Sequence, residues 1–199
     1  MSRPGARARW RGWLGNAALV LGVLLAAHLW QTRAVPSGPA PPLTAPTVDG
    51  RPLSLTQWRA AHPGQPVALH FWAEWCPICK LEEHSIGRVA ADAPVLGVAM
   101  QSGDGAQVAR VMAQRGLHWP TLIDADGQQA RAWGVRAVPA FIVIAPDGRI
   151  SSASVGYTSE LGMRARLWWA RWGGGSYPKA FNTTQPFALS PSTGSGQTG

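Results

Sequence analysis

The chain has 199 residues, of which 46% are hydrophobic and 14% are charged, and it contains eleven tryptophans and two cysteines. This length suits about one domain, which is enough chain to bury a hydrophobic core. The apolar content excludes a chain that is disordered throughout, and two cysteines exclude a fold held together by several disulfides.

The net charge of +8 comes from the two ends of the chain. Residues 1–33 carry five arginines, and residues 161–199 carry three arginines and one lysine, with no acidic residue in either segment. The residues between them carry nine basic and ten acidic side chains. The body of the protein is therefore nearly neutral, and we expect no nucleic-acid partner.

Residues 13–30 contain no Asp, Glu, Lys or Arg. As a helix they would extend ~27 Å, close to the ~30 Å hydrocarbon core of a bilayer. Four arginines precede the stretch and one follows it, which predicts a membrane anchor in residues 1–33 with a cytoplasmic N-terminus and an exported remainder. A cleaved signal peptide is the alternative, although His28-Leu29-Trp30 offers no site of small residues for cleavage.

Two further segments are predicted to lie outside the folded domain. Residues 34–46 contain five prolines, which favours an extended linker of up to ~40 Å at ~3.1 Å per residue. Residues 173–199 are rich in Gly, Ser, Thr and Pro and are predicted to be disordered. The folded domain is therefore expected at residues 47–172.

Within residues 47–172, predicted strands and helices alternate. Asp49-Gly50 indicates a hairpin in residues 47–55, and short apolar stretches predict strands at residues 67–72, 95–100, 120–123 and 140–145. The turn signal Pro146-Asp147-Gly148 predicts a hairpin partner for the last of these at residues 149–154. Helices are predicted at residues 76–91, 128–133 and 159–172, and a further one from a cap at residues 102–104 to Arg115. This order predicts an α/β fold with helices on both faces of a central sheet.

In the last predicted helix, an apolar stripe recurs at helical spacing and is interpreted as the packed face. The stripe consists of Leu161, Ala165, Trp168 and Trp172. Together with Arg164, Arg166 and Arg171, it could instead rest on an anionic membrane surface.

Both cysteines belong to the motif Cys76-Pro77-Ile78-Cys79, which follows a predicted buried strand. At the start of a helix, Cys76 would face unpaired backbone N–H groups and the positive end of the helix dipole, which favour the thiolate. Cys79 follows one turn later, where it can attack a mixed disulfide on Cys76. This arrangement favours redox chemistry. A zinc site would need a second pair of ligands, and a structural disulfide closing so short a ring would stabilise little.

Two segments resemble the thioredoxin superfamily. Residues 71–80 (FWAEWCPICK) are similar to its active-site segment, and residues 134–139 (GVRAVP) are similar to its cis-proline loop. The hairpin signal in residues 49–55 and the predicted anchor resemble the TlpA/ResA branch. Residues 80–86, 98–104 and 155–158 are similar to membrane-anchored suppressor-of-copper-sensitivity D-type protein disulfide oxidoreductases. The resemblance covers residues 43–172 and implies a thioredoxin fold: a central mixed sheet, helices on both faces and an extra N-terminal hairpin.

The resemblance also implies roles for individual residues. Cys76 would be the nucleophile, Cys79 the resolving thiol, and Pro139 a cis-proline beside them. Trp75, Pro77, Ile78 and Val138 flank these groups and are expected to contact substrate.

Two titratable residues are candidates for assisting the cysteines. One of them departs from thioredoxin, and the other resembles a residue of the TlpA/ResA branch. His70 stands where thioredoxin has a buried Asp that assists the second cysteine, and it is either a catalytic group or a hydrogen-bonded core histidine. Glu82 lies one turn after Cys79 and resembles the Glu that tunes the cysteines in the TlpA/ResA branch. A solvated helix charge is the alternative for Glu82.

Two classes of function follow. The first is a membrane-tethered periplasmic thiol–disulfide oxidoreductase, with no cofactor beyond a Cys76–Cys79 disulfide and no metal. It would exchange disulfides with protein substrates and electrons with a membrane partner, and we expect a reductase because Ile78 gives a Cys76 thiolate no support. The second is a copper-binding module that uses Cys76, Cys79 and a histidine such as His70 or His84 as ligands.

Overall fold

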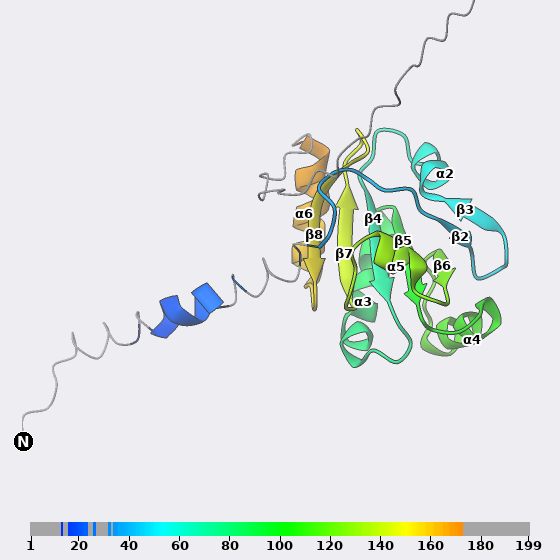
Figure 1. Ribbon diagram of the computed structural model, residues 1–199, viewed down its shortest axis with the longest axis horizontal. Coiled ribbons are helices and arrows are strands. Elements are labelled where there is room, and N and C mark those ends of the chain that lie inside the picture. The colour runs from blue at the N-terminus through cyan, green and yellow to red at the C-terminus, as the bar shows by residue number, and fades with distance from the viewer. Residues whose placement is uncertain (1–12, 14–15, 24–25, 27–31, 33, 173–199) are drawn as a thin grey trace, which may run out of the picture.

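The computed structural model describes residues 13, 16–23, 26, 32 and 34–172 (Figure 1). Its strands are β1 (Gly38–Pro39), β2 (Thr44–Pro46), β3 (Pro52–Ser54), β4 (Val67–Trp72), β5 (Val95–Met100), β6 (Thr121–Asp124), β7 (Ala140–Ile144) and β8 (Arg149–Val155). Its labelled helices are α2 (Leu55–Ala60), α3 (Pro77–Asp92), α4 (Gly105–Arg115), α5 (Gln128–Ala132) and α6 (Glu160–Trp172). The predicted α/β order is confirmed, and helix α2 is an addition to the elements expected from the sequence.

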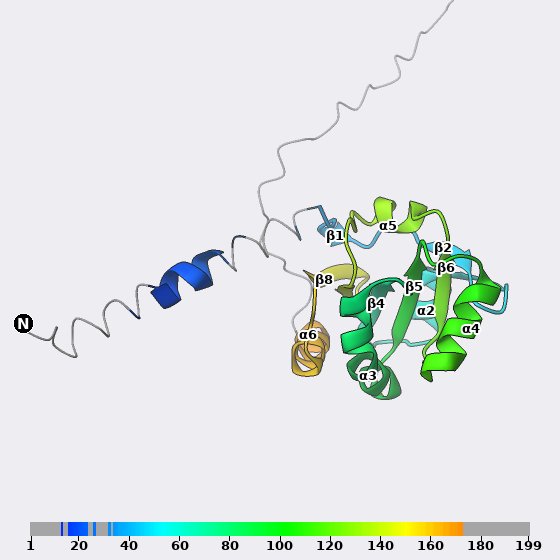
Figure 2. The same ribbon diagram turned by 90° about the horizontal axis from the view of Figure 1, so that it is seen from below.

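A six-stranded mixed sheet forms the centre, with the strand order β1-β8-β7-β4-β5-β6. Strands β4, β5 and β6 run parallel, whereas β7 is antiparallel to both β4 and β8. Helices α3, α4 and α6 contribute to the core on one face of the sheet, and α2, α5 and the hairpin β2–β3 contribute to the core on the other face (Figure 2). The expected helices on both faces and the expected N-terminal hairpin are therefore present.

The central strand β4 is buried along its whole length and serves both cores. Because side chains alternate along a strand, Ala68 and Trp72 face the core of α3, while Leu69 and Phe71 face the opposite core. His70 has the same parity as Ala68 and Trp72. This alternation places the imidazole on the side of α3, the helix that carries the cysteines.

Local sequence signals account for the ends of the longer helices. The carboxylate of Asp104 accepts a hydrogen bond from the Gln107 N–H at the start of α4, and Gly116 ends that helix in the left-handed region at φ 65°. In α3 the missing N–H of Pro77 costs nothing, because the first turn of a helix has no partner for it.

The expected linker at residues 34–46 is instead packed on the domain. Strand β1 pairs with the edge of β8, and β2 pairs with β3. The side chains of Leu43 and Ala45 are buried in the core shared with α2 and α5. Prolines tolerate edge pairing and extended backbone, so a proline-rich segment can still dock through its apolar side chains.

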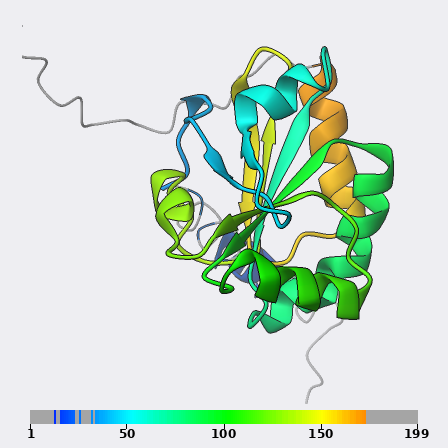
Figure 3. The same cartoon turned by 90° about the vertical axis from the view of Figure 1, so that its right-hand side faces the viewer.

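The stripe interpreted as the packed face of α6 is exposed, which corrects that interpretation. The helix itself packs against β7, β8 and α3 (Figure 3). The buried residues of α6 are Met163, Leu167 and Ala170. These residues have the same helical spacing as the exposed stripe on the opposite side, so the periodicity alone could not choose between them.

The predicted membrane span at residues 13–30 lies only partly within the described residues, and the predicted tail at residues 173–199 lies outside them. Within the part of the chain that the structure describes, no helix is both long and apolar enough to cross a bilayer.

Candidate active site

The two cysteines lie at the first turn of α3, where β4 ends. Cys76 is the N-cap residue, and its Sγ accepts a hydrogen bond from the backbone N–H of Cys79 at 3.1 Å. Both thiols are free and buried, Cys79 more deeply than Cys76. Burial, followed by the hydrogen bond to Cys76, raises the pKa of the Cys79 thiol far above its usual range. The two sulfurs are therefore inequivalent: one caps the helix, and the other needs a base before it can react.

The loop before β7 closes over Cys76. The Val138–Pro139 peptide bond is cis, as expected, and the Cys76 thiol donates to the Val138 carbonyl at 3.5 Å. The carbonyl of Pro139 accepts a hydrogen bond from the Gly156 N–H at 2.8 Å, which joins the loop to the end of β8. Because Pro139 has no N–H, the Val138 carbonyl is the only hydrogen-bonding group of the Val138–Pro139 peptide bond, and it lies beside the Cys76 sulfur.

The segment before the cysteines is held by the loop that follows β5. The Trp75 indole donates to the Gln101 carbonyl at 3.0 Å, and the Glu74 N–H donates to Ser102 Oγ at 3.0 Å. Ser102 is buried and itself donates to the Met100 carbonyl. Gln101 and Ser102 were not expected to support the site. The only sequence signal was the resemblance of residues 98–104.

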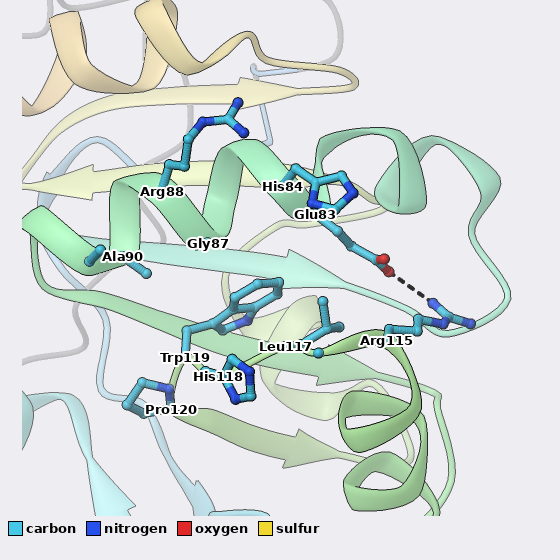
Figure 4. Close-up of a pocket in the computed structure, with 12 residues that line it drawn as sticks. Glu83, His84, Gly87, Arg88, Ala90, Arg115, Leu117, His118, Trp119 and Pro120 are labelled. Carbon is cyan, nitrogen blue, oxygen red and sulfur yellow. Dashed lines mark hydrogen bonds and ion pairs between the residues drawn. The ribbon is translucent and has the colours of Figure 1, made fainter.

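Arg115, at the end of α4, is a second residue whose role near the site the sequence does not predict. Its guanidinium donates to the Glu74 carbonyl at 3.1 Å and to the Glu83 carboxylate at 2.9 Å, as Figure 4 shows for the Glu83 contact. One side chain thus ties α4 both to α3 and to the segment that leads into Cys76. Such bonds between distant elements leave no periodic pattern in a sequence.

Glu82 is 1% exposed and lies on the inner side of α3, so the alternative of a solvated helix charge is wrong. Its Oε2 accepts a hydrogen bond from the Thr158 N–H at 3.0 Å. Burial raises the pKa of Glu82 to about 7, although the bond from Thr158 acts in the opposite direction. The negative charge of Glu82 also adds to the elevation of the Cys79 pKa.

His70 faces Glu82 across the core, with its Nδ1 3.7 Å from Glu82 Oε1. This distance is too long for a hydrogen bond, and Nδ1 has no other hydrogen-bond partner among the described residues. The expectation of a hydrogen-bonded core histidine is therefore not met at this nitrogen. Burial lowers the pKa of His70 to about 3, so the imidazole is neutral near pH 7.

The side chains expected to contact substrate surround the cysteines. Trp75 and Ile78 are exposed to 56% and 43%, Pro77 is exposed, and Val138 is half-buried. A cleft of about 570 Å³ lies elsewhere, between α3 and residues 115–120, and neither cysteine lines it (Figure 4). The exposed side chains of Trp75, Pro77 and Ile78 therefore surround the cysteines, and the cleft does not include the cysteine motif.

Among the described residues, no group of three or more His, Cys, Asp and Glu side chains is arranged to hold a metal ion. His84 faces the cleft between α3 and residues 115–120, which the cysteines do not line. The donor set proposed for a copper-binding module is thus not assembled in the described part of the chain.

A helix-capping cysteine, a buried second cysteine and an adjacent cis-proline loop define a thiol–disulfide oxidoreductase. Comparison with known proteins agrees. Residues 36–153 match the AhpC/TSA family, and the chain belongs to that family, with relatives of the TlpA/ResA branch.

Individual relatives support the same class. The chain is 34% identical to the soluble secreted antigen MPT53 of Mycobacterium tuberculosis, covering 67% of this chain and 77% of that one. It is 29% identical to the thiol:disulfide interchange protein DsbE of Pseudomonas aeruginosa, covering 75% and 85%. The solved structure of MTB dsbF, 26% identical, matches with a TM-score of 0.57 over 64% of this chain and 94% of that one. The thioredoxin fold is thereby confirmed.

Proposed function

We propose that this oxidoreductase acts as a membrane-tethered periplasmic reductase of protein disulfides, working through Cys76 and Cys79. The main structural support for this proposal is the hydrogen bond from the Cys79 N–H to Cys76 Sγ at the N-terminus of α3. Together with the helix dipole, this bond favours Cys76 over Cys79 as the attacking sulfur, so it supports thiol–disulfide exchange at this motif and does not by itself set the direction of electron flow.

The proposed reaction has two steps. The Cys76 thiolate attacks one sulfur of a substrate disulfide, forming a mixed disulfide and releasing the other substrate sulfur as a thiolate. Cys79 then loses its proton and attacks Cys76 Sγ, which releases the second substrate thiolate and leaves a Cys76–Cys79 disulfide. Two electrons pass to the substrate, and a dithiol partner in the membrane must return them.

Glu82 is proposed as the proton acceptor for Cys79. It follows Cys79 by one helical turn, and a carboxyl with a pKa of about 7 exists in both protonation states at neutral pH. His70 is neutral and faces the same carboxyl, so it serves as a positioning residue beside Glu82.

The direction of electron flow is inferred from what surrounds the Cys76 thiolate. Ile78 offers neither charge nor a side-chain hydrogen bond, and an ionised Glu82 disfavours a second negative charge nearby. Both effects raise the free energy of the reduced form relative to the disulfide. Such a protein donates electrons readily, and this supports a reductase over a primary oxidase.

Membrane tethering and periplasmic location are supported by the sequence of residues 1–33, with its charge-free stretch flanked by arginines. A tether would raise the rate of encounter with a membrane electron donor.

The test is the redox state of the full chain in cells, trapped by rapid acid quench and thiol alkylation. We expect Cys76 and Cys79 to be mainly reduced, and to become oxidised when the supply of membrane electrons is blocked. A matched Cys76→Ser/Cys79→Ser variant identifies the signal of these thiols. Cysteines that are mainly oxidised in untreated cells would overturn the reductase assignment.

A further inference from the structure

Helix α6 carries an exposed apolar stripe on the side that faces away from the core. Leu161, Trp168 and Trp172 are 78%, 63% and 73% exposed, and Trp169 beside them is 63% exposed. Single exposed apolar side chains are ordinary, but three exposed tryptophans within five residues form a patch that marks a contact surface.

The charge around this stripe is mainly positive, although two carboxylates pair with one of its arginines. Helix α6 contains three arginines and a single acidic residue, Glu160. Arg164 and Arg171 lie on one flank of the stripe, where Arg164 pairs with Asp92 and Glu160, and Arg166 lies on the other flank. An apolar stripe with tryptophans and flanking arginines is typical of a helix that lies in the interface of an anionic bilayer.

The packing of residues 34–39 places such a bilayer close to the domain, if the proposed anchor holds. The Ala34 carbonyl lies so close to Gly134 that a Cβ there would be 1.8 Å from it, and Val35 packs against the core. Only residues 31–33 then separate the predicted span from the packed chain, a reach of about 10 Å. The domain cannot stand ~40 Å from the membrane, as a free linker would allow.

The chain joins the domain at the edge of the sheet that α6 also borders, although residues 34 and 35 pack on the opposite face from α6. Strand β1 pairs with β8 at this edge, and α6 packs on β7 and β8 from the other face (Figure 2). We propose that the exposed stripe of α6 rests on the surface of the bilayer that holds the tether, with the tryptophans at the headgroup level. This inference rests on the tether in the proposed function.

The test uses the full chain in vesicles of phosphatidylcholine and phosphatidylglycerol whose acyl chains carry bromine, which quenches tryptophan fluorescence on contact. The variant is Trp168→Ser/Trp169→Ser/Trp172→Ser, at exposed positions that the core does not need. The matched control is Trp75→Phe, because the Trp75 indole is bound at the end of β5, on the other side of β4 from β8.

We expect the triple variant to lose about half of the lipid-quenched intensity, since the predicted anchor region supplies three other tryptophans at positions 10, 13 and 30. The control should keep the wild-type intensity. A quenched intensity that is unchanged in the triple variant would overturn the inference. Cross-linked dimers that form in wild type and disappear in the triple variant would also overturn it, because a second copy of the chain would then cover the stripe.

The tether is judged separately by extraction with alkaline carbonate. Wild type and triple variant should both stay with the vesicles, because the anchor is intact in both. Release of both proteins would overturn the tether, whereas retention of both without a difference in quenching would overturn only the contact of α6.

Discussion

Glu82 and His70 face each other across the core, with Oε1 of the carboxyl 3.7 Å from Nδ1 of the imidazole and both side chains 1% exposed. Burial moves their pKa values in opposite directions, to about 7 for Glu82 and to about 3 for His70. Each shift favours the neutral form of its group. The pair is therefore a neutral acid beside a neutral imidazole over much of the acidic range, and it gains charge at Glu82 only near pH 7.

The first prediction concerns the order of the two thiols. Cys79→Ser should accumulate mixed disulfides on Cys76, because Cys76 is the less buried sulfur and the resolving thiol is then missing. The complexes can be counted by non-reducing electrophoresis and mass spectrometry. The matched Cys76→Ser variant should trap far fewer complexes, and equal or stronger trapping there would reverse the two roles.

The second prediction concerns proton transfer. Glu82→Gln should slow resolution of the mixed disulfide by about 10²-fold or more, the usual contribution of a positioned general base, and should alter the first attack much less. Stopped-flow measurement against pH separates the two steps. In wild type the rate of resolution should rise as Glu82 ionises near pH 7. An identical pH–rate profile in the variant would assign the proton to His70 or to solvent.

The third prediction concerns stability. Because the folded-state pKa of Glu82 is raised to about 7, its carboxyl contributes stability that is fully present below about pH 4.5 and is lost as the pH rises through about 7. Glu82→Gln has no such loss. The free energy of unfolding of the reduced variant, relative to wild type, should therefore increase by roughly 1–3 kcal/mol between about pH 5 and pH 8.

Denaturant titration at both pH values tests this expectation. His70 has the opposite dependence, since its lowered pKa makes its contribution to stability fall as the pH drops below about 6.5. That contribution is common to both proteins and largely cancels in the comparison. A difference in stability that does not change with pH would show that the carboxyl ionises normally.

The fourth prediction concerns the docking of residue 34. Gly134 and Gly64 both have left-handed backbones, at φ 66° and 70°, but only Gly134 has another segment where a Cβ would stand. Gly64→Ala should cost about 1 kcal/mol from backbone strain alone. Gly134→Ala should cost clearly more, because the Ala34 carbonyl must also move. Equal losses in the free energy of unfolding would mean that residue 34 is not held there.

The fifth prediction concerns Arg115. Arg115→Gln removes bonds to the Glu74 carbonyl and to the largely buried Glu83, so it should lower the free energy of unfolding by about 1–3 kcal/mol. It should also loosen the segment before Cys76, seen as faster amide exchange there. Arg110→Gln, at an exposed position of the same helix, is the control and should change stability by less than about 0.5 kcal/mol.

The sequence alone determined the order of the larger strands and helices in residues 67–172 and the class of chemistry at the two cysteines, because both depend on local patterns. Compact apolar runs predict β4, β5 and β7, a capping Asp104 and a terminal Gly116 bound α4, and Cys76 and Cys79 stand one helical turn apart. The cis bond before Pro139 was also expected, from a motif within one loop.

Tertiary structure decided what no local pattern contains. Periodicity shows which residues of α6 share a face, but Met163 and Leu167 are buried rather than Trp168 and Trp172 only because of how the helix meets β7 and β8. Composition predicted a free linker at residues 34–46, but the Leu43 side chain is buried in a core formed by segments that are distant in the sequence. The pKa values of His70 and Glu82 likewise follow from burial, which the chain acquires only when β4 and α3 pack together.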